Sequence, residues 1–232
     1  MHKLHHFPGF LIAIEGIDGS GKTTQAHHVQ SALQARKLVV MRTKEPTTGH
    51  WGQVLRDSAV TGRLSLEEEV ETFIKDRKEH VENKINPELA AGHIVIVDRY
   101  YFSSMAYQGA RAGARGITPE EIMQLNERFA PEPDLLVILD IDPKTGLKRI
   151  KTRGDRANHF EKTDTLKKAR EIFLHIQKPY LFKIPACQKP DVITKLIVRQ
   201  FSAIYAERIA HSDGNLKDKL NATLSLFGGD PI

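Results

Sequence analysis

The feature that most constrains this chain is a phosphate-binding loop near its start. Residues 16–23 read Gly-Ile-Asp-Gly-Ser-Gly-Lys-Thr, and the apolar run 10–14 comes directly before them. A buried strand, a glycine-rich turn and a helix N-terminus in this order direct backbone N–H groups and the positive end of the helix toward phosphates. The alternative, a chance glycine-rich turn before a helix, does not account for the complete signature. The sequence therefore predicts nucleotide binding.

Charged and hydroxyl side chains at two strand ends add chemistry to this loop. Lys22 is expected to reach the β- and γ-phosphates, and the Thr23 hydroxyl to lie on the Mg²⁺ ion that neutralises them. Asp98 ends the apolar run 94–97 and suits the water shell of the same ion, while Arg99 suits a phosphate by bidentate contact. An exposed ion pair is the alternative. A hydrolytic motor more often has two adjacent acids here, so Arg99 indicates transfer between phosphates.

Apolar runs alternate with stretches of helical periodicity along the chain. Runs that are apolar on both faces and alternate with helices are typical of a parallel sheet covered on both sides. The predicted strands are 11–15, 38–42, 94–98, 135–140 and a shorter fifth at 180–186. The predicted helices are 23–36, 67–91, 119–129 and one capped by Asp191 that ends near Ile209. Ligands bind at the carboxyl ends of such strands, which selects Glu15, Glu45, Asp98 and the segment after Asp140.

Length and composition limit the possible classes of protein. The 232 residues suit one domain over 1–232, with a core at about 10–210 and a loosely ordered polar tail at 211–232. The net charge of +5 suits small phosphorylated substrates, and no nucleic-acid partner is expected because aromatic residues do not interleave the basic ones. The single cysteine, Cys187, excludes an intramolecular disulfide. No run approaches the length of a membrane span, so we expect a cytoplasmic protein without a membrane partner.

A basic stretch with a glycine in it follows the predicted strand 135–140. Between Gly146 and Glu161 it contains Lys148, Arg149, Lys151, Arg153 and Arg156. A basic helix face alone is usually solvated. This stretch follows a strand that should end at the same edge of the sheet as the phosphate loop. We therefore expect a mobile lid that brings arginines onto the transferring phosphates and excludes water.

With these elements together, the chain resembles the thymidylate kinase family of nucleoside monophosphate kinases from about residue 10 to residue 201. The resemblance rests on the strings at 15–25 and 45–46, on Phe73 with Arg77, and on Asp-Arg-Tyr at 98–100 followed by Ala-Tyr-Gln-Gly at 106–109. The last string is the most discriminating, because other monophosphate kinases share the phosphate loop. The resemblance implies a P-loop NTPase-type α/β fold, with a five-stranded parallel sheet, helices on both faces and a mobile lid. It also implies ATP-dependent, Mg²⁺-assisted phosphorylation of dTMP to dTDP in dTTP biosynthesis.

The resemblance assigns site residues in four groups. The implied ATP contacts are Gly16, Ile17, Asp18, Gly19, Ser20, Gly21, Lys22, Thr23, Thr24 and Arg149. The implied dTMP contacts are Asp18, Glu45, Arg56, Phe73, Arg77, Arg99, Ser104, Tyr107 and Gln108. The implied catalytic residues are Asp18, Lys22, Arg99, Arg153 and Arg156, with Thr23 and Asp98 at the metal.

Within the implied dTMP site, Phe73 and Arg77 stand four residues apart and share a helix face, so the ring can stack on the base while the guanidinium donates to a base carbonyl. A core Phe beside a surface Arg is the alternative. Ser104 and Gln108 would contact the base edge, and Tyr107 would crowd the 2′ position and favour a deoxyribose. The remaining implied roles are a hydrogen bond from the sugar 3′-hydroxyl to Asp18 and a monophosphate held by Arg56 and Arg99.

Some family members carry an arginine at the position of Gly19, whereas others carry it in the lid, and this chain resembles the second group. Three departures from the family pattern stand out. Lys-Glu-Pro-Thr-Thr occupies 44–48, Ala-Asn-His at 157–159 interrupts the lid, and the tail beyond Ile209 is long. The lid departure leaves open whether Arg153 or Arg156 acts on the phosphates.

Two further expectations concern assembly and rival functions. Relatives are usually homodimers, and apolar positions at 70–81 and 102–106 could form the interface. The nearest rival is a kinase of the same fold for another monophosphate or for a deoxynucleoside. A GTP-dependent switch or a non-catalytic binding module is less consistent with the chain, which lacks an Asn-Lys-x-Asp signature. The expected reaction is direct in-line transfer without a covalent intermediate, and it needs no strong general base because the acceptor phosphate is already anionic.

Overall fold

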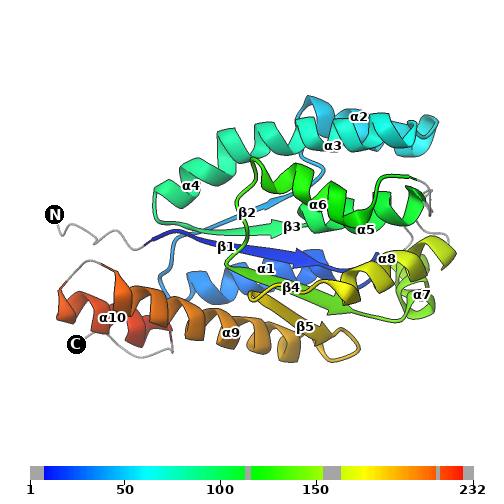
Figure 1. Cartoon of the computed structure of the whole chain (residues 1–232). Helices are drawn as coiled ribbons and strands as arrows, with labels where there is room; N and C mark the ends of the chain where they lie inside the picture. The colour runs from blue at the N-terminus through cyan, green and yellow to red at the C-terminus, as the bar shows by residue number, and fades with distance from the viewer. Residues whose placement is uncertain (1–7, 113–115, 154–162, 213–214, 227–232) are drawn as a thin grey trace.

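In the computed structural model, which describes residues 8–112, 116–153, 163–212 and 215–226, five parallel strands form one sheet. The sheet has the order β2-β3-β1-β4-β5, and the arrows in Figure 1 run in one direction. Its strands are β1 (Phe10–Glu15), β2 (Val40–Lys44), β3 (Ile94–Asp98), β4 (Leu135–Asp140) and β5 (Leu181–Pro185). The predicted parallel five-stranded α/β fold is confirmed.

The central strands are apolar on both faces because helices cover both sides of the sheet. Every residue of β1 and β3 is buried. Strand β1 pairs with β3 on one edge and with β4 on the other, so Ile12 lies opposite both Ile96 and Leu135. This register brings the ends of β1 and β3 to the same edge of the sheet, where Ile14 lies opposite Asp98.

Helices form a layer on each side of the sheet (Figure 1). On one side lie α1 (Lys22–Gln34), α9 (Pro190–His211) and α10 (Leu216–Leu226). On the other side lie α2 (His50–Thr61), α3 (Leu66–His80), α4 (Asn86–Ala90), α5 (Tyr101–Ala112) and α6 (Pro119–Glu127). The π-helical turn η1 (Val81–Ile85) joins α3 to α4, and α7 (Pro143–Arg153) and α8 (Thr163–His175) follow β4. The predicted helix 67–91 is therefore α3, η1 and α4 in succession.

Two details at the C-terminal end differ from the sequence-based expectations. Asp191 does not cap α9, because Lys189 is the N-cap and Pro190, whose fixed φ suits the first helical turn, begins the helix. Residues 216–226 form α10 instead of a loose tail. Leu226 is buried there, and its carbonyl oxygen accepts hydrogen bonds from Ser202 at 3.2 Å and from Arg36 at 3.0 Å.

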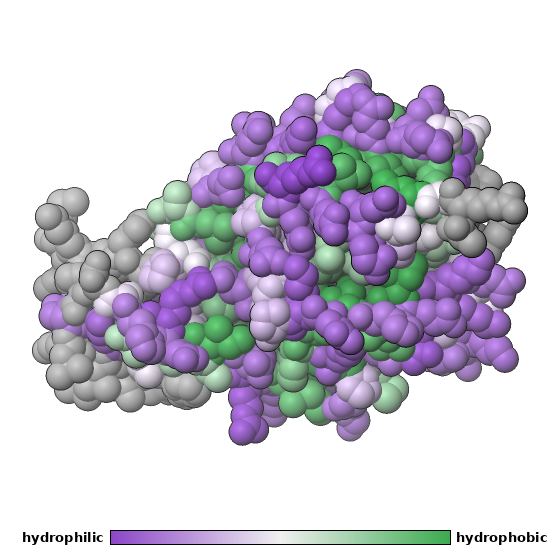
Figure 2. Space-filling model, viewed as in Figure 1, coloured by the Kyte–Doolittle hydropathy of each residue, from purple (hydrophilic) through white to green (hydrophobic). Residues whose placement is uncertain are grey.

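Hydrophilic residues cover most of the face shown in Figure 2, and hydrophobic residues reach the surface in separate patches between them. Phe102 and Ala106 have no exposed area, because α5 packs against α3, α6 and α8. These two positions therefore belong to the core of the protomer and not to an outer surface. Across the described ranges, no helix combines the length and apolarity needed to cross a membrane.

Candidate active site

The phosphate loop links the end of β1 to the start of α1, as its pattern predicts. Gly19 and Gly21 have φ angles of 80° and 98°, in the left-handed region that favours glycine. A Cβ atom at Gly19 would lie only 2.3 Å from the carbonyl oxygen of Gly146 in α7. The loop and α7 are thus in direct backbone contact, which places the start of the basic segment against the loop.

Lys22 is buried at the base of this loop, where its Nζ donates a hydrogen bond of 2.9 Å to the carbonyl oxygen of Ile17. Burial lowers the pKa of the Lys22 amine to about 8, and the positive charge of Arg99 acts in the same direction. Asp18 and Asp98 oppose this shift. A cation placed here is poorly solvated, so an anionic ligand in the loop would stabilise its charged form.

Thr23 and Asp98 meet between the phosphate loop and the end of β3. The Thr23 hydroxyl donates a hydrogen bond of 2.6 Å to Oδ2 of Asp98. The other carboxylate oxygen, Oδ1, is buried and has no hydrogen-bond partner among the described residues. A buried carboxylate oxygen that is left open beside a hydroxyl oxygen is the donor set that a hard cation such as Mg²⁺ prefers.

Asp18, Arg99 and Tyr107 form one contact group at the mouth of the loop. The Arg99 guanidinium forms an ion pair with Asp18, and the Tyr107 hydroxyl donates to the other oxygen of Asp18 at 3.1 Å. Burial would raise the pKa of Asp18, but the charges of Arg99 and Lys22 outweigh it and hold this pKa below its usual range. Asp18 therefore carries its negative charge at neutral pH, beside the positive charge of Arg99, while the Tyr107 hydroxyl stays neutral.

Glu15 braces the turn that carries Arg99. Its carboxylate accepts hydrogen bonds from the backbone N–H of Tyr100 at 2.7 Å and of Ser103 at 3.0 Å, and from the Ser103 hydroxyl at 2.6 Å. These bonds hold the first turn of α5 close to Arg99, which precedes the helix and takes a φ of 70°. Burial raises the pKa of Glu15 to about 7, although the bonds from Ser103 and Tyr100 and nearby cations partly offset it.

Two cavities meet at this edge of the sheet. The first follows the phosphate loop, and its lining includes Lys22, Thr23, Asp98 and Arg149. The second is mainly apolar, and its lining includes Leu55, Phe73, Arg77, Ser104, Tyr107 and Gln108. Both cavities share a wall made by Asp18, Glu45, Pro46, Arg56 and Arg99. An anion that spans the two cavities would therefore lie against two guanidinium groups.

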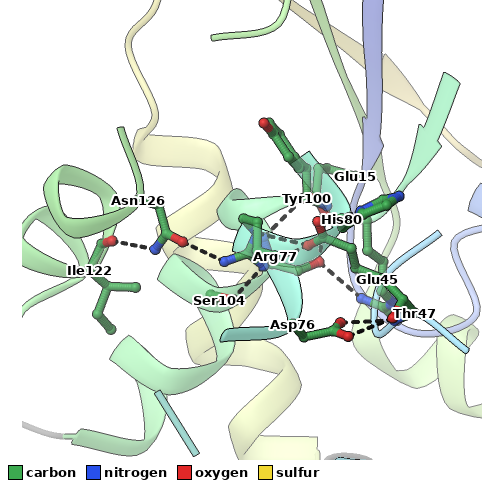
Figure 3. Close-up of polar contacts among 12 residues, drawn as sticks. Glu15, Glu45, Thr47, Asp76, Arg77, His80, Tyr100, Ser104, Ile122 and Asn126 are labelled. Atoms are coloured by element: carbon green, nitrogen blue, oxygen red, sulfur yellow. Dashed lines mark hydrogen bonds and ion pairs between the residues drawn. The ribbon is translucent and has the colours of Figure 1, made fainter. Parts of the chain in front are cut away.

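The second cavity contains the half-buried ring of Phe73 and the fully buried Arg77, both on α3. Glu45 accepts from Arg77 Nε at 2.8 Å and lies 2.7 Å from Nη2, while His80 lies 3.0 Å from the other Glu45 oxygen (Figure 3). The Ser104 hydroxyl accepts from Arg77 Nη2 at 3.0 Å. In this structure Glu45 and Ser104 thus orient Arg77.

Asn126 on α6 completes this network, and the sequence analysis does not include it. Its Oδ1 accepts a hydrogen bond of 2.6 Å from Arg77 Nη1, and its Nδ2 donates at 2.7 Å to the carbonyl oxygen of Ile122 (Figure 3). Asn126 is 1% exposed. The sequence contains a signal for Asn126: it follows Ile122 by four positions, so a polar residue lies on the apolar face of a helix.

Arg56 and Arg149 reach the site from elements on opposite sides of it. From α2, Arg56 donates hydrogen bonds to the carbonyl oxygens of Thr47 at 2.5 Å and Pro46 at 3.3 Å. From α7, Arg149 donates hydrogen bonds to the carbonyl oxygens of Gly19 at 3.4 Å and Ala186 at 3.0 Å. Of the other basic residues of the expected lid, Lys148 and Lys151 are exposed on α7. The side chain of Arg153 and the whole of Arg156 lie outside the described residues.

Comparisons with known proteins agree with this geometry. The family model for thymidylate kinase matches residues 14–197. A protein named thymidylate kinase from Xanthomonas oryzae pv. oryzae is 47% identical to this chain over 219 residues, which cover 94% of both chains. Another of the same name, from Xanthomonas euvesicatoria pv. vesicatoria, is 48% identical to this chain over 224 residues, which cover 95% of both chains. A further relative from Akkermansia muciniphila is 51% identical over 178 residues, which cover 77% of this chain and 84% of the relative. The chain belongs to the thymidylate kinase family.

Proposed function

We propose that this chain transfers the γ-phosphoryl group of ATP to dTMP, producing ADP and dTDP, as a step toward dTTP. Its membership of a family of kinases supports the phosphotransfer. The observation that carries the proposal is the shared wall between the two cavities, where Arg56 and Arg99 lie. One cavity is polar and formed by the phosphate loop, and the other is mainly apolar and fits a base. A phosphate between them would meet both arginines.

On the donor side, the loop and α7 would hold the triphosphate. Backbone N–H groups of Gly19 to Lys22 surround the phosphates, and the charged Lys22 amine neutralises the β- and γ-phosphates. Arg149 lies beside the loop, close to Ala186, where the adenine would enter. Arg153 and Arg156 are both proposed as lid arginines that act on the phosphates.

On the acceptor side, each group meets the chemistry of a deoxyribonucleoside monophosphate. The Phe73 ring stacks on the base, and Arg77, held by Glu45, donates to a base carbonyl. Ser104 and Gln108 line the base edge of the same cavity. The pair of Asp18 and Tyr107 lies where the sugar would sit between base and phosphate, so it can bind the 3′-hydroxyl and crowd the 2′ position.

Thr23 and Asp98 are the proposed Mg²⁺ site. The open buried oxygen of Asp98 and its contact with the Thr23 hydroxyl support it. When bound, Mg²⁺ would neutralise the phosphate oxygens of ATP. The chain itself then positions both phosphates in line, excludes water and stabilises the spreading negative charge through Lys22 and Arg99.

The proposed function is tested by measuring ADP release with ATP, Mg²⁺ and five acceptors: dTMP, dUMP, dCMP, dGMP and AMP. A strong preference for dTMP is expected because the apolar cavity ends in Arg77 and Gln108. Turnover of a different monophosphate would keep the phosphotransfer and overturn the base assignment. The absence of acceptor-dependent release would contradict the proposed enzyme altogether.

A homodimer is the proposed assembly. A mainly apolar groove beside α3 supports it, and its lining includes Leu66, Val70, Ile74 and Ile117 alongside two glutamates. This groove replaces the expected surface at 102–106, whose Phe102 and Ala106 are buried. Sedimentation analysis of wild type and Ile74→Asp tests the assembly, with dissociation of the variant as the expected outcome.

A further inference from the structure

A buried carboxylate lies beside the amide of Gln108 at the base end of the apolar cavity. Gln108 on α5 is 1% exposed, and its Nε2 donates a hydrogen bond of 2.6 Å to Oε1 of Glu69 on α3. The amide oxygen of Gln108, Oε1, is buried and has no hydrogen-bond partner among the described residues. Both residues line the cavity that also contains Phe73 and Arg77. The cavity wall therefore contains an acceptor that awaits a donor.

The orientation of the Gln108 amide is dictated by Glu69. An ionised carboxylate only accepts hydrogen bonds, so Gln108 must turn its nitrogen toward Glu69 and its oxygen away. Glu69 cannot rotate freely, because Arg63 contacts it through Nε at 2.8 Å and through Nη2 at 3.2 Å, and Arg111 forms a second ion pair with it. Glu69 is itself 2% exposed. The two arginines thus fix the carboxylate, and the carboxylate fixes the amide.

We propose that Glu69 is a positioning residue that sets base selectivity by presenting the oxygen of Gln108 to the base edge. This inference rests on the proposed function, because it concerns the base that enters that cavity. Thymine offers a carbonyl oxygen next to an N3–H donor, whereas cytosine offers an amino donor next to an unprotonated N3 acceptor. Arg77 matches the thymine carbonyl, and the Gln108 oxygen matches the thymine N3–H. Cytosine opposes both contacts, which leaves two buried groups unpaired.

The substitution Glu69→Gln is the sharpest test, because it changes hydrogen-bond polarity at constant size. Arg63 Nε and Arg111 both donate to Oε2 of Glu69, whereas Oε1 accepts from Gln108 at 2.6 Å and from Arg63 Nη2 at the longer distance of 3.2 Å. Because Oε2 has the stronger donors, the new amide would place its oxygen at the Oε2 position and its nitrogen at the former Oε1 position. That nitrogen faces Gln108, which must now turn its own oxygen toward it and its nitrogen toward the base. The cavity would then present a donor where it had an acceptor, which suits the N3 of cytosine and repels the N3–H of thymine.

The expected result for E69Q is a rise of about tenfold in the KM for dTMP, the usual effect of one buried hydrogen bond, with kcat changed by less than about threefold. The ratio of kcat/KM for dTMP over dCMP should fall by about tenfold or more. The ratio of kcat/KM for dTMP over dUMP should stay unchanged, because uracil presents the same carbonyl oxygen and N3–H donor as thymine. A general loss of structure would not lower the first ratio while leaving the second unchanged.

Two controls distinguish positioning from a merely structural role. Glu67→Gln removes an exposed carboxylate from the same turn of α3 and should leave the KM for dTMP and both ratios of kcat/KM unchanged. In the background of Gln108→Met, adding E69Q should not lower the dTMP over dCMP ratio further, because Glu69 acts through Gln108. Should E69Q not fold, Glu69→Asp is the second variant. It keeps a negative charge beside Arg63 and Arg111, but its shorter side chain moves the carboxylate away from Gln108. The same fall in the ratio of kcat/KM for dTMP over dCMP is expected.

The outcomes separate this inference from the proposed function. A wild-type enzyme that prefers dTMP, together with an unchanged dTMP over dCMP ratio in folded E69Q, would overturn the role of Glu69 and leave the function standing. Additive effects of E69Q and Q108M would also overturn it. A wild-type enzyme without a preference for dTMP would overturn the proposed function, and the inference with it.

Discussion

The carboxylate of Asp18 is ion-paired with the guanidinium of Arg99, which lies 81 residues later in the chain. This pair joins the phosphate loop to the end of β3 at the wall that the two cavities share. Arg99 also donates to the Ser103 hydroxyl at 3.2 Å, and Ser103 is in turn bound by Glu15. Arg99 is therefore held in place before any substrate phosphate arrives, so little reorganisation is needed when it binds.

Replacing Arg99 by Ala should lower kcat/KM for dTMP by about 10³-fold, because it removes a fixed donor from the site where charge develops. Arg99→Lys should recover only part of this loss, since an ammonium group cannot make a bidentate contact. Steady-state kinetics of both variants check the prediction, and Arg199→Ala, at an exposed position on α9, is the control. Near-normal kcat/KM in Arg99→Ala would falsify the assigned role.

Thr23→Val should raise the Mg²⁺ concentration needed for half-maximal rate by about tenfold, because the variant loses the proposed hydroxyl ligand and the 2.6 Å hydrogen bond to Asp98. Thr23→Ser retains the hydroxyl and should behave like wild type. The measurement is a Mg²⁺ titration at saturating ATP and dTMP. Equal titration curves for Val and Ser would show that the hydroxyl does not contribute.

Binding of ATP above pH 8 should be accompanied by proton uptake. Burial lowers the pKa of Lys22 to about 8 in the free protein, and phosphates beside the amine favour its charged form, so the pKa is higher in the complex. Because the bound state holds more protons, affinity should fall as pH rises through about 8. Calorimetry at pH about 8.5 in two buffers of different ionisation enthalpy should show uptake of roughly 0.7 proton. Lys22→Arg, which stays charged, should show none.

Asn126→Leu should weaken dTMP binding and destabilise the fold together. The variant leaves a buried N–H of Arg77 without an acceptor, which should lower the free energy of unfolding by about 1–3 kcal/mol. Because Arg77 is also the proposed hydrogen-bond donor to the base and would be held less firmly, the KM for dTMP should rise several-fold. Asn126→Asp keeps an acceptor at this place and should retain a KM near that of wild type. Urea unfolding and kinetics measure both effects, with Gln124→Leu on the exposed face of α6 as the control. An unchanged KM in Asn126→Leu would remove Asn126 from the base site.

Local pattern was sufficient for the sheet and the loop, because a strand that is apolar on both faces and a glycine-lysine signature are each encoded within a few residues. Contacts between distant helices were not readable in this way. Asn126 meets Arg77 across 49 positions and Glu69 meets Gln108 across 39, so both depend on how α3 packs against α5 and α6. The order of α10 likewise depends on Arg36 and Ser202, which no tail composition reveals.

The close approach of Gly146 in α7 to Gly19 leaves no room for a side chain at that position of the loop. An arginine at position 19 would need a Cβ atom in space that α7 fills, at a φ that side chains rarely adopt. Such a chain would have to move α7 away and with it the arginines that follow. We therefore expect that an arginine placed at position 19 alone would displace α7 and disable the enzyme without adding a useful cation.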